Sequence, residues 1–186
     1  GLGASRGGRL LFGSLDLTIT GPERVAITGP NGAGKTTLLT ILDGRSRPDS
    51  GTVRRITPAR TLLDQHVGLP PEASSVLEAF RLCHPTLSDN EARAALARFG
   101  FRNRAAEAAL ASLSGGERVR AGLACAFAGR VPPELVILDE PTNHLDRDAR
   151  ASLIAALQSY DGAILAVSHD ADFLAGIGVE RTIRLG

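Results

Sequence analysis

One loop of eight residues constrains the fold of this chain more than any other feature. Residues 29–36 are Gly-Pro-Asn-Gly-Ala-Gly-Lys-Thr, preceded by an apolar segment at 24–28 and followed by a helical pattern at 35–42. Glycines let successive backbone N–H groups face one centre, and the start of the helix adds partial positive charge there. The pattern predicts a strand, a phosphate-binding loop and a helix, and therefore an α/β chain that binds a nucleoside triphosphate.

The loop contains the single lysine of the chain, Lys35, although the sequence has 21 basic residues. A compact ammonium fits beside the β- and γ-phosphates where a broad guanidinium would not. The hydroxyl of Thr36 can bind the Mg2+ that accompanies a nucleotide. We therefore predict that ATP and Mg2+ are the cofactors, and that the nucleotide is bound by Gly29, Pro30, Asn31, Gly32, Ala33, Gly34, Lys35, Thr36 and Thr37.

A second motif places two carboxylates at the end of an apolar segment. Residues 135–138 (LVIL) predict a strand in the middle of a parallel sheet. The next two residues, Asp139 and Glu140, would then lie at the carboxyl edge of the sheet, where α/β folds bind their ligands. Asp139 is suited to holding Mg2+, and Glu140 is suited to acting as general base for an attacking water.

A third motif opens a helix with small and polar residues. Ser114 is a candidate helix N-cap, and Gly115 and Gly116 leave backbone N–H groups exposed beside it. Taken alone, this pattern is an ordinary cap and hinge. Between the other two motifs, it indicates a second helix start that can bind an anion.

The rest of the chain alternates strands and helices, which predicts a mostly parallel sheet flanked by helices. Gly21-Pro22 predicts a turn. Strands are expected at 9–20, 24–28, 61–64, 135–138, 163–167 and 181–185, with an edge strand within 45–58. Helices are expected at 35–42, 76–82, 88–100, 114–128 and 147–159. The fold expected is a P-loop NTPase fold with a small antiparallel β part, in which residues 1–66 and 130–186 form the α/β core and residues 67–129 form an inserted helical lobe.

Composition narrows the class of protein further. The net charge of +1 argues neither for nor against a polyanionic partner. The two cysteines, Cys83 and Cys125, are isolated, which indicates reduced buried thiols and not a zinc site. No apolar run approaches the ~18 residues that span a bilayer, so we expect no direct membrane insertion and a cytoplasmic location. The chain contains no methionine, which suggests a domain taken from a longer protein.

With these motifs in place, the chain resembles the nucleotide-binding domain of the ATP-binding cassette (ABC) superfamily. The phosphate loop corresponds to Walker A, Leu-Ser-Gly-Gly-Glu at 113–117 to the signature, and residues 135–140 to Walker B. Gln65, Asp146 and His169 stand at the positions of the Q-loop, the D-loop and the switch histidine. The resemblance covers residues 9–185 with six motifs in the family's order.

The resemblance implies roles that the residues alone do not. Gln65 would bind Mg2+ and sense the γ-phosphate, and His169 would contact the γ-phosphate and help to organise the water, so that Glu140, His169 and Gln65 are the catalytic set. The metal set is Thr36, Gln65 and Asp139. A second ABC ATPase domain would be the partner, because the family binds ATP between two domains. The residues facing the shared nucleotide would be Ser114, Gly115, Gly116, Glu117 and Asp146.

The string Pro-Thr-Asn-His-Leu-Asp at 141–146 most resembles the ABC-F branch. That resemblance implies a soluble ATPase acting on the ribosome, in translation or antibiotic resistance. One alternative is the ATPase subunit of a membrane transporter, whose partner would be a membrane domain. Another is a nucleotide-gated binding module that hardly hydrolyses ATP, against which Glu140 argues. Many relatives stack an aromatic ring on adenine at a position that falls near Arg6 here, so the sequence supports phosphate binding more strongly than adenine selectivity.

Overall fold

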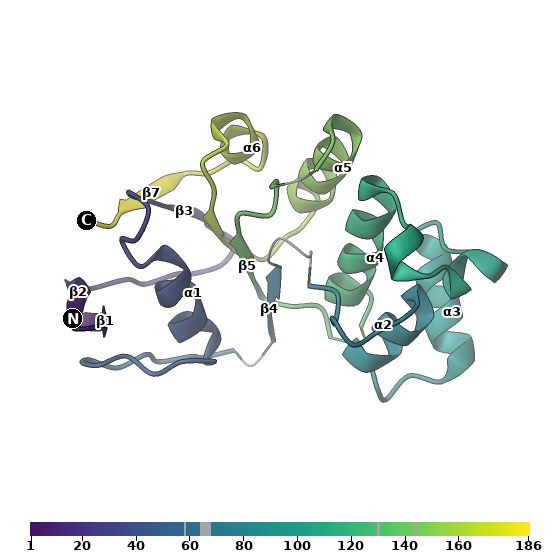
Figure 1. Ribbon diagram of the computed structural model, residues 1–186, viewed down its shortest axis with the longest axis horizontal. Coiled ribbons are helices and arrows are strands. Elements are labelled where there is room, and N and C mark those ends of the chain that lie inside the picture. The colour runs from purple at the N-terminus through teal and green to yellow at the C-terminus, as the bar shows by residue number, and fades with distance from the viewer. Residues whose placement is uncertain (58, 64–67, 130, 144) are drawn as a thin grey trace. The chain divides into compact units, whose positions relative to one another are not determined.

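The computed structural model describes all residues except 58, 64–67, 130 and 144. Its main sheet has five strands in the order β4-β5-β6-β3-β7 (Figure 1). These strands are β3 (Arg24–Thr28), β4 (Arg60–Leu63), β5 (Leu135–Asp139), β6 (Ala163–Val167) and β7 (Arg181–Arg184). The pairs β3–β6, β3–β7 and β5–β6 run parallel, which confirms the predicted sheet.

A separate sheet pairs β1 (Leu2–Arg6) with β2 (Arg9–Leu15) in antiparallel orientation. Gly7 and Gly8 join the two strands with positive φ angles of 58° and 77°. Residues with φ above zero suit the tight turns of hairpins, and glycine adopts them without steric cost. This hairpin is the small antiparallel part that the sequence predicts, although only its second strand was expected.

The strand that precedes the phosphate loop is buried on both faces. Val25, Ala26 and Ile27 of β3 have no exposed surface, as an apolar run in a parallel sheet requires. After the loop, α1 (Lys35–Asp43) ends at Gly44, whose φ of 92° lets its N–H donate to the carbonyls of Thr40 and Ile41. The predicted strand–loop–helix unit is therefore confirmed.

The remaining helices begin at side chains that cap them. They are α2 (Val76–Cys83), α3 (Asp89–Arg98), α4 (Gly115–Phe127), α5 (Arg147–Gln158) and α6 (Ala171–Gly176), with short 3-10 turns η1 (Asn103–Glu107) and η2 (Leu110–Ser112). Ser88 and Glu91 form the predicted capping box at the start of α3, in which each side chain accepts a backbone N–H of the other residue. The helix α6 and both 3-10 turns were not expected from the sequence.

The chain forms two compact units. The first contains residues 1–62, 134–140 and 161–186, and the second contains residues 63–133 and 141–160. The core of the second unit is built by α2, α3 and α4, with Phe80, Leu96, Phe101 and Ala121 among its buried residues. The helix α5 belongs to this unit and packs on α4, whereas residues 147–159 were expected in the α/β core.

The predicted edge strand within residues 45–58 is wrong for the part of this segment that the structure describes. Ser50 forms only an isolated antiparallel bridge with Gly3, in which the Gly3 N–H donates to the Ser50 carbonyl at 3.0 Å. The segment is held instead by a side chain, because Nε of Arg55 donates to the carbonyl of Leu42 at 2.9 Å.

No described helix combines the length and hydropathy needed to cross a membrane.

Candidate functional site

The phosphate loop adopts a conformation that its glycines make accessible. Gly29, Gly32 and Gly34 have φ angles of 144°, 81° and 93°, in the region that side chains rarely adopt. A Cβ built on Gly29 would lie 2.4 Å from the carbonyl oxygen of Leu185, and one on Gly34 would lie 2.8 Å from Cβ of Leu11. Two of the three glycines are therefore needed for space as well as for backbone conformation.

Lys35 is folded over this loop. Its side chain is nearly buried, with 9% of the residue exposed. Its ammonium group donates to the carbonyl of Gly29 at 2.8 Å and to that of Pro30 at 3.2 Å. These carbonyls offset part of the cost of removing the charge from water. The arrangement holds a positive charge at the centre of a loop whose N–H groups can also bind an anion.

The other loop residues complete the cradle. Ala33 is buried and donates its N–H to the carbonyl of Pro30 at 3.2 Å, which closes a turn inside the loop. Asn31 and Thr36 are exposed, and Thr37 is half-buried. The hydroxyl of Thr36 stands on the first turn of α1, which contacts β5.

Asp139 and Glu140 follow β5, as predicted. Asp139 ends the strand and pairs with Val167 of β6, while Glu140 lies just beyond with a φ of 49°. A positive φ is unusual for glutamate and needs support from its surroundings. The Glu140 N–H supplies that support by donating to the carbonyl of Val167 at 2.9 Å.

His169 lies against Glu140. The backbone N–H of His169 donates to Oε2 of Glu140 at 3.3 Å, and its Nε2 lies 3.4 Å from Oε1. The Glu140 side chain is 18% exposed and the His169 side chain 62% exposed, so the pair is open to a ligand on the histidine side. Because β5, β6 and β3 are adjacent parallel strands, this pair and the phosphate loop lie at the same edge of the sheet.

The signature residues and the D-loop aspartate come together in the second unit. Ser114 caps α4, and its N–H and hydroxyl both donate to Oε2 of Glu117, at 2.9 and 2.8 Å. Both bonds hold the pKa of Glu117 below its ordinary value, and the bond from the Ser114 backbone N–H has the larger effect. Asp146 caps α5 by accepting the Ala149 N–H at 2.8 Å. Oδ2 of Asp146 would lie 3.4 Å from a Cβ built on Gly115. Because glycine has no Cβ, the start of α4 can lie close to the Asp146 carboxylate.

One residue of the predicted site has no structural description, because Gln65 lies outside the described residues. Gly116 is half-buried on the first turn of α4. The roles assigned to the individual site residues stay predictions. The support of Glu140 by the Val167 carbonyl was missed, and no pattern in the sequence indicates it.

The donor set of the first unit fits Mg2+. Among the described residues, no three His, Cys, Asp or Glu side chains gather closely enough to hold a metal by themselves. Mg2+ needs no such cluster, since it is bound through one or two protein oxygens together with waters and substrate phosphates. The hydroxyl of Thr36 and the carboxylate of Asp139, on the contacting elements α1 and β5, are oxygen ligands of that kind.

The fold and the loop together define a P-loop nucleotide-binding domain. Comparison with known proteins identifies its family. A family model described as ABC transporter matches residues 12–143. This match covers more than half of the 186 residues, so the chain belongs to the ABC transporter family.

Relatives of known sequence point to one branch of the family. The chain is 38% identical over 173 residues to ABC transporter F family member 3 of Arabidopsis thaliana, a match that covers 91% of this chain and 24% of that protein. It is 32% identical to ATP-binding cassette sub-family F member 2 of Bos taurus, covering 89% of this chain and 27% of that protein. The chain thus spans about a quarter of the length of these relatives. Their names support the ABC-F branch predicted from residues 141–146.

Solved structures confirm the predicted fold. The chain is similar to the ATP-binding cassette MJ0796, solved as a dimer in a post-hydrolysis state bound to ADP and Pi, with a TM-score of 0.75 and 22% identity. A second dimeric structure of this bacterial ABC transporter cassette gives a TM-score of 0.77 at 23% identity. Each match covers 99% of this chain and 91% of that chain.

Proposed function

We propose that this chain is the ATPase domain of a cytoplasmic ABC-F protein, and that it binds ATP with Mg2+ and hydrolyses it. The observation that carries the proposal is the geometry of the first unit. A buried lysine stands over a glycine loop, and a glutamate paired with a histidine lies at the same edge of the sheet.

Binding would begin with the phosphates of ATP. The loop N–H groups and the start of α1 attract the β-phosphate, and the Lys35 ammonium exchanges its bonds to Gly29 and Pro30 for bonds to phosphate oxygens. Bound Mg2+ would neutralise charge on the β- and γ-phosphates, held by Thr36 and Asp139. The loop therefore supplies positioning and charge compensation.

Hydrolysis would use Glu140 as the base. A water attacks the γ-phosphorus, its proton passes to the Glu140 carboxylate, and the bond to the ADP oxygen breaks to leave ADP and phosphate. His169, 3.4 Å from that carboxylate, would contact the γ-phosphate and orient the water. The bond from the Glu140 N–H to Val167 keeps the carboxylate at the edge of the sheet.

A second ABC ATPase domain would complete the site. We propose that Ser114, Gly115 and Gly116 contact the γ-phosphate that the partner domain binds. The capping geometry supports this role, because it directs the first N–H groups of α4 outward at a helix start. The dimeric state of MJ0796, bound to ADP and Pi, is consistent with such a pair.

We further propose that the protein binds the ribosome, because residues 141–146 resemble the ABC-F branch. This proposal is tested in the full-length protein that contains this chain. A Glu140→Gln variant should retain ATP binding and lose at least about a hundredfold in turnover, since a general base contributes about 10²–10⁴. With ATP present, this variant should sediment with ribosomes, and without ATP it should not. Lys35→Ala in the same background is the control that cannot bind nucleotide well.

The outcomes separate the candidate functions. Wild-type turnover in the Glu140→Gln variant would exclude Glu140 as the base. Sedimentation with the membrane fraction in place of ribosomes would instead support the ATPase subunit of a transporter. Equal sedimentation with and without ATP would contradict an ATP-controlled cycle.

A further inference from the structure

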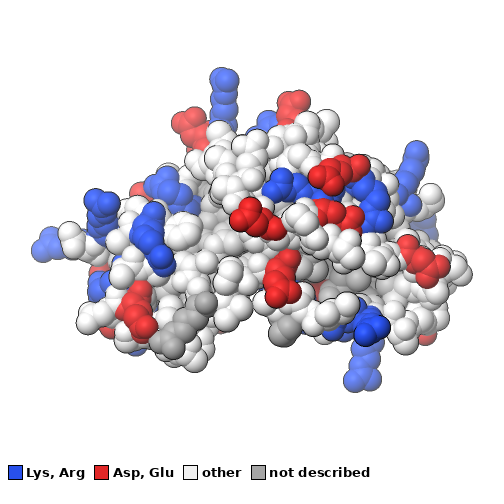
Figure 2. Space-filling model, turned by 180° about the vertical axis from the view of Figure 1, so that it is seen from behind, with Lys and Arg blue, Asp and Glu red and all other residues white. Residues whose placement is uncertain are grey.

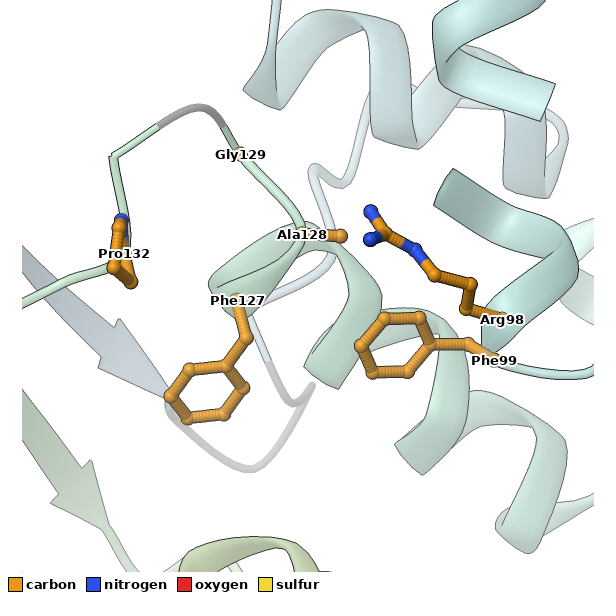
Figure 3. Close-up of a pocket in the computed structure, with 6 residues that line it drawn as sticks. All are labelled: Arg98, Phe99, Phe127, Ala128, Gly129 and Pro132. Carbon is orange, nitrogen blue, oxygen red and sulfur yellow. The ribbon is translucent and has the colours of Figure 1, made fainter. Parts of the chain in front are cut away.

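The second unit contains an open hollow beside the end of α4. Its volume is about 450 Å³, and none of its lining residues belongs to the site proposed above. The lining comes from the end of α3 and from the segment that ends and follows α4: Arg98, Phe99, Phe127, Ala128, Gly129 and Pro132. Figure 3 shows Arg98 and Phe99 reaching toward Ala128 from one side, with Phe127 and Pro132 on the other.

Two phenyl rings give the hollow a fixed aromatic lining. Phe99 and Phe127 are both half-buried. The Phe127 ring lies 5.3 Å from that of Tyr160, whose hydroxyl is itself held by the carbonyl of Pro133 at 2.8 Å. Phe99 packs against the core of the second unit. Rings held from behind offer a flat surface on which a planar group can stack.

Arg98 lines the hollow beside these rings, and Arg102 and Arg104 follow it closely in the sequence. Arg98, Arg102 and Arg104 are exposed, and none of them forms an ion pair with a residue that the structure describes. The acid that follows them, Glu107, is paired with Arg93 at 2.5 Å. Figure 2 shows exposed basic side chains, with acidic ones among them, on one face of the molecule. Arg98 thus brings a positive charge without a described ion-pair partner to the aromatic hollow, and two further exposed arginines follow it in the sequence.

We propose that the hollow and the arginines of residues 98–104 bind an unpaired stretch of RNA. One base stacks on Phe99 or Phe127, while Arg98, Arg102 and Arg104 contact the phosphates on either side. The proposal rests on the ribosome-associated function proposed above, and it names the class of surface that this unit contacts.

The chemistry of the lining selects this occupant. Unpaired RNA presents flat bases and closely spaced phosphates together, and proteins read it by stacking bases on aromatic rings beside basic grooves. Arginine binds phosphate with two parallel N–H groups and also stacks on planar groups. A double helix would satisfy the arginines but conceal its bases. An acidic peptide would also satisfy the arginines, but it would leave the rings without a planar partner.

The test measures binding of a fluorescently labelled single-stranded RNA of about 12 nucleotides to the full-length protein, by fluorescence anisotropy. Phe127→Leu keeps the side chain apolar but removes the ring, and should weaken binding about fivefold to a hundredfold through lost stacking. Arg98→Ala should reduce the slope of log K against log salt concentration by about 0.7, as expected for one lost phosphate contact. ATP turnover should stay at the wild-type value in both variants, which checks folding.

Arg81→Ala is the matched control. Arg81 lies near the other end of α3, where it pairs with Asp89 at 2.8 Å, so its loss removes a charge from the same unit but outside the hollow. RNA affinity in this variant should match that of the wild type. If Arg98→Ala and Arg81→Ala weaken binding equally, the positive charge of the unit acts diffusely and the site is overturned.

Two further outcomes decide the proposal. Wild-type RNA affinity in both Phe127→Leu and Arg98→Ala would overturn it. Displacement of the RNA by polyglutamate at equal charge would also overturn it, in favour of an acidic protein partner. If Glu140→Gln fails to sediment with ribosomes while the Phe127 and Arg98 effects on RNA binding persist, the proposed function fails and the RNA site stands.

Discussion

Replacing Gly34 by alanine tests how tightly the phosphate loop is packed. The residue has a φ of 93°, and its Cβ would lie 2.8 Å from Cβ of Leu11 and 3.2 Å from Cδ1 of Phe12. A positive φ costs a non-glycine residue about 1–3 kcal/mol. Forcing a methyl group against the half-buried Leu11 and the buried Phe12 adds about 1–3 kcal/mol. Gly34→Ala should therefore lower the free energy of unfolding by about 2–6 kcal/mol.

Gly32→Ala is the control that separates the two causes. Gly32 has a φ of 81°, but a Cβ there would meet nothing within 4 Å. It should cost only the backbone strain, about 1–3 kcal/mol. Thermal melting of the purified chain measures the difference, and at this chain length each kcal/mol corresponds to about 2–4 °C in Tm. Equal losses of Tm in the two variants would refute the argument that contact with β2 makes Gly34 necessary.

The remaining predictions concern charge and capping. Lys35→Ala should raise the Kd for ATP about tenfold to a hundredfold, because a charged hydrogen bond contributes about 1.5–3 kcal/mol; unchanged affinity by calorimetry would contradict the binding mode. The hydrogen bonds from Ser114 lower the pKa of Glu117 in the folded protein below its ordinary value of 4.5. The ionised carboxylate therefore stabilises the fold fully at pH values above the pKa of the unfolded chain. This contribution is lost as the pH falls through the lower pKa of the folded protein. The Tm difference between wild type and Glu117→Gln should shrink across that interval, and a constant difference would argue against the capping box. Ser88→Ala should cost about 1 kcal/mol in urea unfolding by removing an N-cap, and no change would show that the box at α3 contributes nothing.

The elements with strong local patterns were predictable from sequence. The glycine loop, the apolar strands β3, β5 and β6 and the capping box at Ser88 each depend on residues close in sequence, and the structure has them where they were expected. Those patterns also placed Asp139 and Glu140 at the end of β5. Local rules succeeded there because both strand burial and helix capping are determined within a few residues.

Elements that depend on distant partners were not predictable. The strand β1 was missed for a different reason, since its partner β2 is adjacent in sequence but the pattern of Leu2–Arg6 itself is weak. The described part of segment 45–58 does not pair with a neighbouring strand. Instead, the Arg55 side chain donates a hydrogen bond to the carbonyl of Leu42 near the end of α1. The positive φ of Glu140 depends on the carbonyl of Val167, which is remote in sequence. No pattern within a single segment of the sequence indicates these contacts.

The bonds of Lys35 to the loop carbonyls would make nucleotide binding partly an exchange reaction, if Lys35 binds phosphate as proposed. Two of the three ammonium donors already have oxygen partners at 2.8 and 3.2 Å, so a phosphate that takes these donors would displace the carbonyls. The affinity for ATP would then include a difference between two sets of charged hydrogen bonds, each of about 1.5–3 kcal/mol. When product leaves, Gly29 and Pro30 would accept the ammonium again, so the loop would compete with the phosphates for Lys35.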